Sequence, residues 1–274
     1  MQQKTISKEI LLSGIGLHQG KLVRMRLLPA PENQGIVFRR IDLPGRPGIL
    51  ASYKNIVSSH RGMVMASGEA TVATTEHLMA AFWSAGIDNV TVEIDGSEVP
   101  AMDGSALPLT VSINQAGTTN LGATKSPLIA KKAFTIKENQ SEISVSPYRG
   151  LRITFMVDYP GVGAQSFVFD EKTEFESEIA PARTFGYLQE VEALKAKGLA
   201  LGAGMENALV LDREKGYVNV PRFPDEPVRH KILDLLGDLY LTGKNVHAEI
   251  KATRSSHQLN LVLANKLMES ASAE

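Results

Sequence analysis

Hydrophobic and polar residues alternate along three short segments of the chain, 22–27, 90–94 and 151–155. Successive side chains of a β-strand point to opposite faces of a sheet, so this alternation predicts strands that bury one face. Two longer segments, 76–85 and 228–242, have the apolar spacing of buried helices. Strands and helices are therefore mixed in both halves of the chain, which predicts an α+β fold.

Residues that typically begin or end helices flank both helical segments. Thr74 or Thr75 can cap the start of the first helix, and Gly86 stands where a left-handed residue ends it. Pro227 lies at the start of the second helix and Gly243 at its end. The sequence thus predicts where both helices begin and end.

The two halves of the chain share a local pattern. Each predicted helix is followed by a glycine and then by Asn-Val-x-x-Glu-Ile, at 89–94 and again at 245–250. The small, polar segment 118–127 lies between the halves and is the best candidate for a linker. We therefore predict a duplicated α+β unit, with one domain at 1–122 and a second at 127–270.

Composition excludes several classes of function. The chain has 274 residues, 29 Lys plus Arg and 30 Asp plus Glu, for a net charge of −1. This balance predicts no binding to nucleic acid. The sequence contains neither an apolar run long enough for a transmembrane segment nor an N-terminal signal peptide, so we expect a cytoplasmic protein. Because it has no cysteine, any metal site must use histidine and carboxylate ligands.

Two histidine motifs carry the main chemical signal. His230, Asp234 and Asp238 are spaced four residues apart and project from one face of the second helix. An imidazole and a carboxylate one turn apart can bind a divalent cation, and His77 can supply a third ligand. Two histidines, one carboxylate and a water form a catalytic zinc set, although the same ligands suit Fe²⁺. Glu76, beside His77, is then placed to take a proton from that water. We predict that the metal lies between the two copies of the duplicated unit.

The other four histidines lack an acid at a useful spacing. His247 falls on the polar face of a strand, which predicts a solvated side chain. His18 lies in a glycine-rich turn, where a histidine usually satisfies backbone groups. His60 and His257 lie in segments that we predict to be loops, and either could border a pocket.

Alternative motifs fail at identifiable positions. A thermolysin-type His-Glu-x-x-His site would need a second histidine where the chain has Ala81. The segment that starts at Gly14 resembles a dinucleotide-binding fingerprint, but Gln19 replaces its last glycine. Neither motif explains the chain.

Several motifs together resemble one family over nearly the whole chain, the zinc-dependent UDP-3-O-acyl-N-acetylglucosamine deacetylases of lipid A biosynthesis. The motifs that carry this resemblance are Gly14-Ile15-Gly16-Leu17-His18, Thr75-Glu76-His77-Leu78, Pro100-Ala101-Met102-Asp103-Gly104-Ser105, Ala182-Arg183-Thr184-Phe185, the run from Val228 to Leu239, and His257-Gln258-Leu259-Asn260.

The resemblance implies roles for individual residues. His77, His230 and Asp234 would bind Zn²⁺, with Glu76 as general base. The other implied catalytic residues are His257 as cationic acid, Asp238 as the carboxylate that orients it, Thr184 at the oxyanion and Lys231. Phe185 would contact the substrate, and Lys231 and Arg254 are candidates for its diphosphate.

The resemblance also implies a fold and a setting. It predicts two similar domains, each a layered sheet with helices packed between the domains, and each carrying a small insert. The second insert would be a βαβ unit near 188–212 that forms an apolar passage for the acyl chain, with Leu199, Leu201, Met205 and Leu209. The expected protein is a monomer in the cytoplasm of a Gram-negative-type bacterium, with UDP-3-O-acyl-N-acetylglucosamine as its substrate.

One position departs from the family pattern. Ser256 precedes His257 where the family usually has glycine, which predicts a backbone conformation that serine adopts less easily. Two other functions are compatible with the residues alone. A non-catalytic sugar-nucleotide module would use a closed structural metal site, without a base beside it. A zinc amidase for another N-acetyl sugar would lack the apolar insert.

Overall fold

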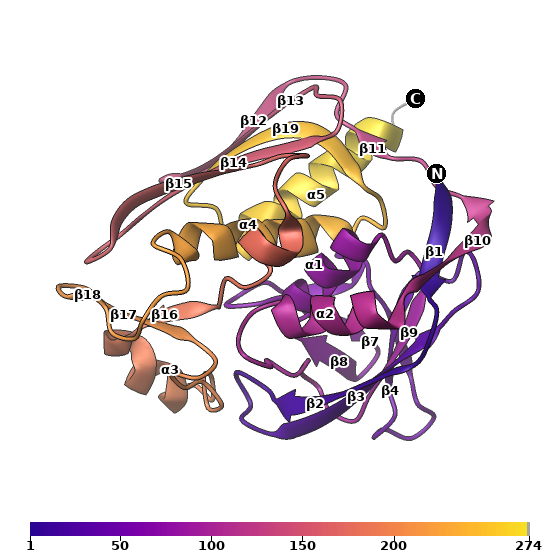
Figure 1. Ribbon diagram of the computed structural model, residues 1–274, viewed down its shortest axis with the longest axis horizontal. Coiled ribbons are helices and arrows are strands. Elements are labelled where there is room, and N and C mark those ends of the chain that lie inside the picture. The colour runs from indigo at the N-terminus through magenta and orange to yellow at the C-terminus, as the bar shows by residue number, and fades with distance from the viewer. Residues whose placement is uncertain (273–274) are drawn as a thin grey trace.

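The computed structural model of the protein describes residues 1–272 and contains two large β-sheets with helices between them (Figure 1). The first sheet has five strands in the order β2-β3-β9-β4-β5. Its strands are β2 (Ile10–Ile15), β3 (Leu22–Pro29), β9 (Val90–Ile94), β4 (Ile36–Arg40) and β5 (Gly48–Leu50).

The second sheet has the order β12-β13-β19-β14-β15, and a short strand, β11 (Leu128–Ile129), also pairs with β19. Its strands are β12 (Phe134–Glu138), β13 (Ser141–Ser146), β19 (Val246–Thr253), β14 (Leu151–Tyr159) and β15 (Gly163–Phe169). In both sheets the third strand in this order pairs in parallel with the fourth, and the other neighbours are antiparallel. The two halves therefore share one topology, as the repeated sequence pattern predicted.

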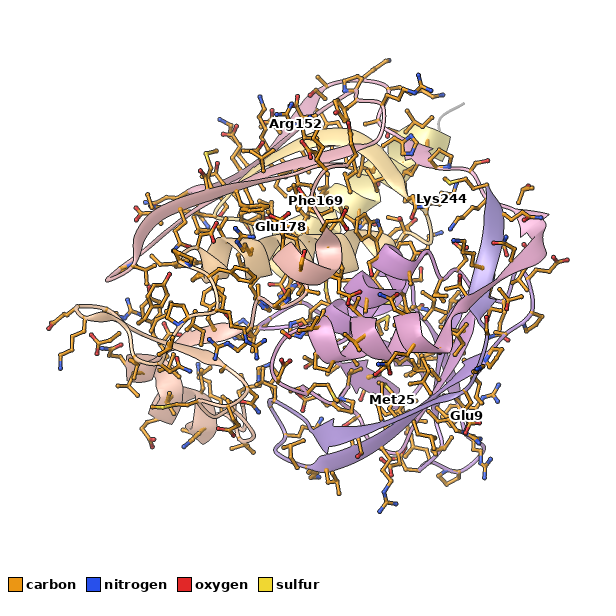
Figure 2. All side chains as sticks on the ribbon, in the orientation of Figure 1. Glu9, Met25, Arg152, Phe169, Glu178 and Lys244 are labelled. Carbon is orange, nitrogen blue, oxygen red and sulfur yellow. The ribbon has the colours of Figure 1, made fainter. Side chains whose placement is uncertain are left out.

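Four long helices form the layer between the sheets. Each half contributes a helix, the central strand of its sheet and a second helix, in that order along the chain. The first half contributes α1 (Glu76–Ala85) and α2 (Leu107–Ala116), and the second contributes α4 (Glu226–Tyr240) and α5 (His257–Ser272). Met25 on β3 and Phe169 on β15 point from the two sheets toward this layer (Figure 2), and both are almost fully buried.

Each half also carries an insert. The first lies between β5 and α1, and the second lies between β15 and α4. The first insert is an antiparallel sheet of β6 (Ile56–Ser58), β7 (Val64–Ser67) and β8 (Ala70–Ala73), and the 3₁₀ turn η1 (Tyr53–Asn55) precedes it. The second insert contains β16 (Phe185–Tyr187), η3 (Leu188–Glu190), α3 (Val191–Ala196), β17 (Leu209–Asp212) and β18 (Gly216–Tyr217). Because β16 and β17 are parallel, it is a βαβ unit that starts slightly before the predicted residue 188. A π-helical turn, η2 (Phe175–Ile179), precedes it.

The segment predicted as a linker has regular structure. Residues Thr118–Thr124 form β10, which pairs antiparallel with β1 (Gln2–Ile6) at the side of the molecule (Figure 1). The segment still connects the two halves, and we propose the domain boundary at residues 122–127. No helix within residues 1–272 is both long and apolar enough to cross a membrane.

The predicted ends of the helices are only partly correct. Gly86 ends α1 in the left-handed conformation, with φ 69°, as expected. Thr75 precedes α1, but its side chain makes no capping hydrogen bond. Thr74 instead donates its hydroxyl to Glu98. Helix α4 starts at Glu226, two residues earlier than predicted, with Pro227 in its first turn.

Helices α1 and α4 approach each other so closely that one position between them must be glycine. A Cβ atom built at Gly237 on α4 would overlap the backbone carbonyl of Glu76 on α1. The carbonyl belongs to a helix backbone and cannot swing aside as a flexible side chain could. The two helices can therefore cross at this distance only with glycine at position 237.

We expect Gly237→Ala to destabilise the protein by about 3 kcal/mol or more, because overpacking a rigid contact forces whole helices apart. Chemical denaturation of the variant would measure this loss. Gly186→Ala is the matched control, since nothing lies within 4 Å of a Cβ at Gly186. A Gly237→Ala variant as stable as the Gly186→Ala control would contradict the proposed constraint.

Candidate active site

Helices α1 and α4 bring three potential metal ligands together at the centre of the molecule. Their ligand atoms on His77, His230 and Asp234 all lie within 4.8 Å of one another. Oδ1 of Asp234 is 3.4 Å from Nε2 of His230 and 3.8 Å from Nε2 of His77. All three side chains are buried. The sequence placed His230 and Asp234 on one helix face and named His77 as a third ligand, and the structure brings the three side chains together.

The protonation states of this cluster suit a cation. Burial and the neighbouring His230 lower the pKa of His77 to about 3, and burial also lowers the pKa of His230. Both rings are therefore neutral at pH 7. Burial acts to raise the pKa of Asp234, but the positive charge of Lys231, with a further contribution from His257, outweighs it and holds that pKa well below its usual range. Two neutral imidazoles and one ionised carboxylate are a fitting donor set for a divalent metal.

A backbone contact fixes the orientation of one of these rings. Nδ1 of His230 lies 3.0 Å from the carbonyl oxygen of Ala182 and donates its hydrogen there. Because Nδ1 carries the hydrogen, Nε2 keeps the free lone pair that faces Asp234. Metal-binding histidines are commonly oriented by a hydrogen bond of this kind.

Glu76 lies next to the cluster with its carboxylate buried. Its Oε2 accepts a hydrogen bond from the backbone N–H of Met63 at 3.1 Å. Its Oε1 is 3.8 Å from Nε2 of His257. Burial raises the pKa of Glu76 to about 7, although the nearby His257 opposes this shift. A carboxylate with a pKa near neutrality can both accept and release a proton at physiological pH.

His257 is the first residue of α5, so the predicted loop at this position is wrong. Its Nδ1 is 2.8 Å from Oδ2 of Asp238, which also accepts a hydrogen bond from Nδ2 of Asn260 at 2.8 Å. Burial acts to lower the pKa of His257, but Asp238 and then Asp234 outweigh it and raise the pKa to about 9. His257 therefore carries a positive charge at pH 7.

Ser256 does not have the glycine-like conformation that the family pattern suggested. The residue with positive φ in this turn is Arg254, at 50°. The hydroxyl of Ser256 accepts a hydrogen bond from the backbone N–H of Leu259 at 3.3 Å, and its carbonyl accepts one from Asn260. Serine here satisfies free N–H groups in the first turn of α5, and it fits the position without strain.

The cluster opens into a cleft of about 680 Å³ between the two inserts. Glu76, His77, His230, Asp234 and His257 line it. Three further predicted residues also line the cleft, namely Thr184, Phe185 and Lys231. Asp238 lies behind His257 and is almost fully buried.

Lys231 and Phe185 each contact one of the potential metal ligands directly. Nζ of Lys231 is 2.6 Å from Oδ2 of Asp234. The ring of Phe185 packs edge-on against His230 at 5.9 Å between ring centres, and against Tyr159 at 5.1 Å. These contacts place an ammonium group and an aromatic ring beside the potential metal ligands.

The remaining predicted substrate residues lie outside the cleft lining. Arg254 pairs with Asp158 at 2.9 Å on the surface. Leu201 and Met205 are about half exposed on the second insert, whereas Leu209 is fully buried within that insert's sheet. The loop that contains Leu199 and Leu201 joins the N-terminal half, where the backbone N–H of Leu201 donates to the carbonyl of His18.

Sequence reasoning missed several residues at the rim of the cleft. They include Leu17, Tyr159, Tyr187 and Glu190, and also Arg61, which pairs with Glu190 at 2.7 Å across the two inserts. His60 also lines the rim, as its place in a loop allowed. His18 lies behind this rim, where its ring contacts the carbonyl of Arg61 and the backbone N–H of Ala200. The contacts between the inserts join segments that are far apart along the chain, so no local sequence pattern could predict these rim residues.

A duplicated α+β fold with a buried His₂Asp set, a neighbouring carboxylate and an open cleft suits a metal-dependent hydrolase. A family model described as UDP-3-O-acyl N-acetylglycosamine deacetylase matches residues 3–269, and the chain belongs to this family. The resemblance found in the sequence is thereby confirmed.

Relatives with the same description extend over nearly the whole chain. The UDP-3-O-acyl-N-acetylglucosamine deacetylase of Citrifermentans bemidjiense is 43% identical over 273 residues, covering 97% of this chain and 89% of that protein. The deacetylase of Geotalea uraniireducens is 44% identical over 272 residues, with 97% and 88% covered. That of Thermosynechococcus vestitus is 42% identical over 270 residues, with 97% and 94% covered.

We expect alanine at His77, His230 or Asp234 to abolish tight metal binding while the chain stays folded. Each change removes one of the three potential ligands found in this cluster among residues 1–272. Elemental analysis of the purified variants, with circular dichroism to confirm folding, would measure the loss. His247→Ala is the control, because His247 lies on a strand away from the cleft lining. Full metal occupancy in any two of the three ligand variants would contradict the assignment.

Proposed function

We propose that the protein is a zinc-dependent amidohydrolase that deacetylates UDP-3-O-acyl-N-acetylglucosamine, the committed step of lipid A biosynthesis. The observation that carries this proposal is the position of Glu76 and His257, 3.8 Å apart, beside the potential metal ligands and inside an open cleft. Family membership and the names of the relatives supply the substrate. A structural metal would need a fourth protein ligand and no adjacent base, so the geometry favours catalysis.

The reaction joins water to an amide and releases acetate and a free amine. A Zn²⁺ ion bound by His77, His230 and Asp234 would polarise the acetyl carbonyl and lower the pKa of a coordinated water. The same ligands suit Fe²⁺, so metal analysis of the purified protein is the first test.

The residues of the chain then handle the protons. Glu76, in its ionised form, accepts a proton as the water attacks the acetyl carbon. His257, in its charged form, and the Thr184 hydroxyl stabilise the negative charge that develops on the acetyl oxygen. The leaving nitrogen must gain a proton, and Glu76 and His257, 3.8 Å apart, are the two candidates to supply it.

Charged and apolar surfaces next to the cleft suit the two ends of the substrate. We propose Lys231 and Arg254 as contacts of the diphosphate, and Phe185 as a contact of the sugar. Leu199, Leu201 and Met205 are proposed to contact the acyl chain, because their loop adjoins the cleft residue Leu17. Leu209 would support this loop from the interior of the insert. We further propose a cytoplasmic monomer in a Gram-negative-type bacterium, which light scattering can test for the oligomeric state.

We expect a bell-shaped dependence of kcat/KM on pH, with Glu76 and His257 titrating as a coupled set. Activity falls at low pH because Glu76, alone or together with the coordinated water, must lose a proton to act. Activity falls at high pH because His257, whose pKa is raised to about 9, loses its charge. Asp238→Asn removes the strongest influence that raises this pKa, so the basic limb should move to lower pH.

His257→Ala provides the complementary test. It should keep its metal and lose about 10²–10⁴ in rate, the usual contribution of a positioned acid or base. Metal content and pH–rate profiles of both variants measure these effects. An unmoved basic limb in Asp238→Asn, or near-normal activity in His257→Ala, would refute the assigned roles.

We expect Leu201→Asp to raise KM for a long-chain substrate far more than for a short-chain analogue. A carboxylate placed against an alkyl chain is desolvated without a partner, which costs several kcal/mol, whereas a short chain never reaches it. Leu11→Asp is the matched control, since Leu11 is another exposed leucine, on β2 of the N-terminal sheet. Equal effects of Leu201→Asp on both substrates would show that the loop does not contact the acyl chain.

A further inference from the structure

A buried ion pair connects the start of α4 to the segment that precedes the second insert. The side chains of Glu226 and Arg183 are 0% and 8% exposed, and Nε of Arg183 lies 2.9 Å from Oε1 of Glu226. Neither residue lines the cleft. The pair therefore has no direct access to a substrate, and its role must be sought in what it holds in place.

Three hydrogen bonds of this pair fasten backbone groups near it to the start of α4. Oε1 of Glu226 accepts from the backbone N–H of Arg183 at 2.9 Å, as well as from its Nε. Oε2 accepts from Nη2 of Arg183 at 3.2 Å and from the backbone N–H of Arg222 at 2.5 Å. Nη2 also donates to the carbonyl of Val220 at 2.8 Å. A buried pair with its hydrogen bonds satisfied on both sides is rigid, and removing one partner leaves an uncompensated charge.

The residues on either side of Arg183 both belong to the site. The carbonyl of Ala182 accepts the hydrogen of His230 Nδ1. Thr184 lines the cleft, and its backbone N–H donates to the carbonyl of Gly104 at 2.7 Å. Since consecutive residues cannot move independently, a shift of Arg183 would displace the Ala182 carbonyl and the Thr184 side chain together.

The other end of the pair is set by the helix. Glu226 and His230 are four residues apart on α4, so they lie on one face, one turn from each other. The ion pair and the His230–Ala182 hydrogen bond are thus two neighbouring connections between α4 and the segment that contains Ala182 and Arg183. The ion pair therefore holds the Ala182 carbonyl within hydrogen-bond distance of His230.

We propose that Arg183 and Glu226 are positioning residues for the metal centre. They hold the Ala182 carbonyl against His230, which keeps the imidazole in the orientation and tautomer that present Nε2 to the metal. They also hold Thr184 at the wall of the cleft. This inference rests on the proposed function, because it assigns the supporting residues of the same metal site.

The test is the affinity of the metal-free protein for Zn²⁺, measured by competition with a chelator. Arg183→Met combined with Glu226→Leu removes both charges and replaces them with apolar side chains, a change that buried pairs often tolerate in stability. We expect a loss of about 10–100-fold in Zn²⁺ affinity, the usual cost of losing a partner that orients a ligand. At saturating Zn²⁺, kcat should fall while KM changes little.

A matched pair elsewhere in the chain controls for general destabilisation. Arg40 and Asp42 form a partly buried ion pair, with 2.7 Å between Nη2 and Oδ2, and neither lines the cleft. Arg40→Met with Asp42→Leu should alter thermal stability and leave Zn²⁺ affinity and kcat unchanged. Arg183→Lys keeps the charge without the two-pronged contact, so its Zn²⁺ affinity should fall between wild type and the double variant.

The outcomes separate this inference from the proposed function. A wild-type protein that binds no Zn²⁺ would remove the proposed function itself. Wild-type affinity in the folded double variant, beside a wild-type protein that does bind, would overturn only the positioning role. If the double variant does not fold, Arg183→Lys decides, and wild-type affinity together with an unchanged absorption spectrum of its Co²⁺ form overturns the proposal.

Discussion

The close crossing of α1 and α4 is the constraint on which the site depends. Gly237 lets the backbone of α4 reach the carbonyl of Glu76, the first residue of α1. That contact lies next to two residues of the site, because His77 follows Glu76 and Asp238 follows Gly237. Each half of the chain holds only part of the potential ligand set. A larger residue at position 237 would separate the parts by the width of a side chain, which exceeds the tolerance of a metal site.

The buried charges of the site are arranged so that most have a partner. Asp234 is paired with Lys231, and Asp238 with His257. Burying an unpaired charge is costly, so each pairing permits an ionised group in a place shielded from water. Glu76 is hydrogen-bonded to a backbone N–H instead of a cation, and its pKa is accordingly the one that burial raises to about 7. The same lack of a charged partner that would destabilise an ordinary carboxylate gives this one a pKa at which it can accept and release a proton near neutral pH.

The sequence predicted best what depends on local spacing. His230, Asp234 and Asp238 fall on one helix face by periodicity alone, and Gly86 ends α1 by its conformational freedom. The duplicated unit was visible in a six-residue repeat because that repeat occupies the central strand of each sheet. Tertiary contacts overrode local preference elsewhere: 118–124 became a strand because β1 pairs with it, and His257 began a helix instead of lying in a loop. The rim of the cleft was missed because its contacts join the two inserts, which no local pattern encodes.

The duplication explains why the cleft lies where it does. Both inserts lie at equivalent points of the duplicated fold, between β5 and α1 in the first half and between β15 and α4 in the second. Helices α1 and α4 cross at the centre of the molecule, so the segments that precede them lie close together beside the crossing. The first insert then supplies His60 and Arg61 to the rim, and the second supplies Phe185 and Tyr187. The ion pair between Arg61 and Glu190 joins these inserts. The core of the duplicated fold thus brings the potential metal ligands together, while sequences inserted at equivalent points form the walls that a substrate would meet.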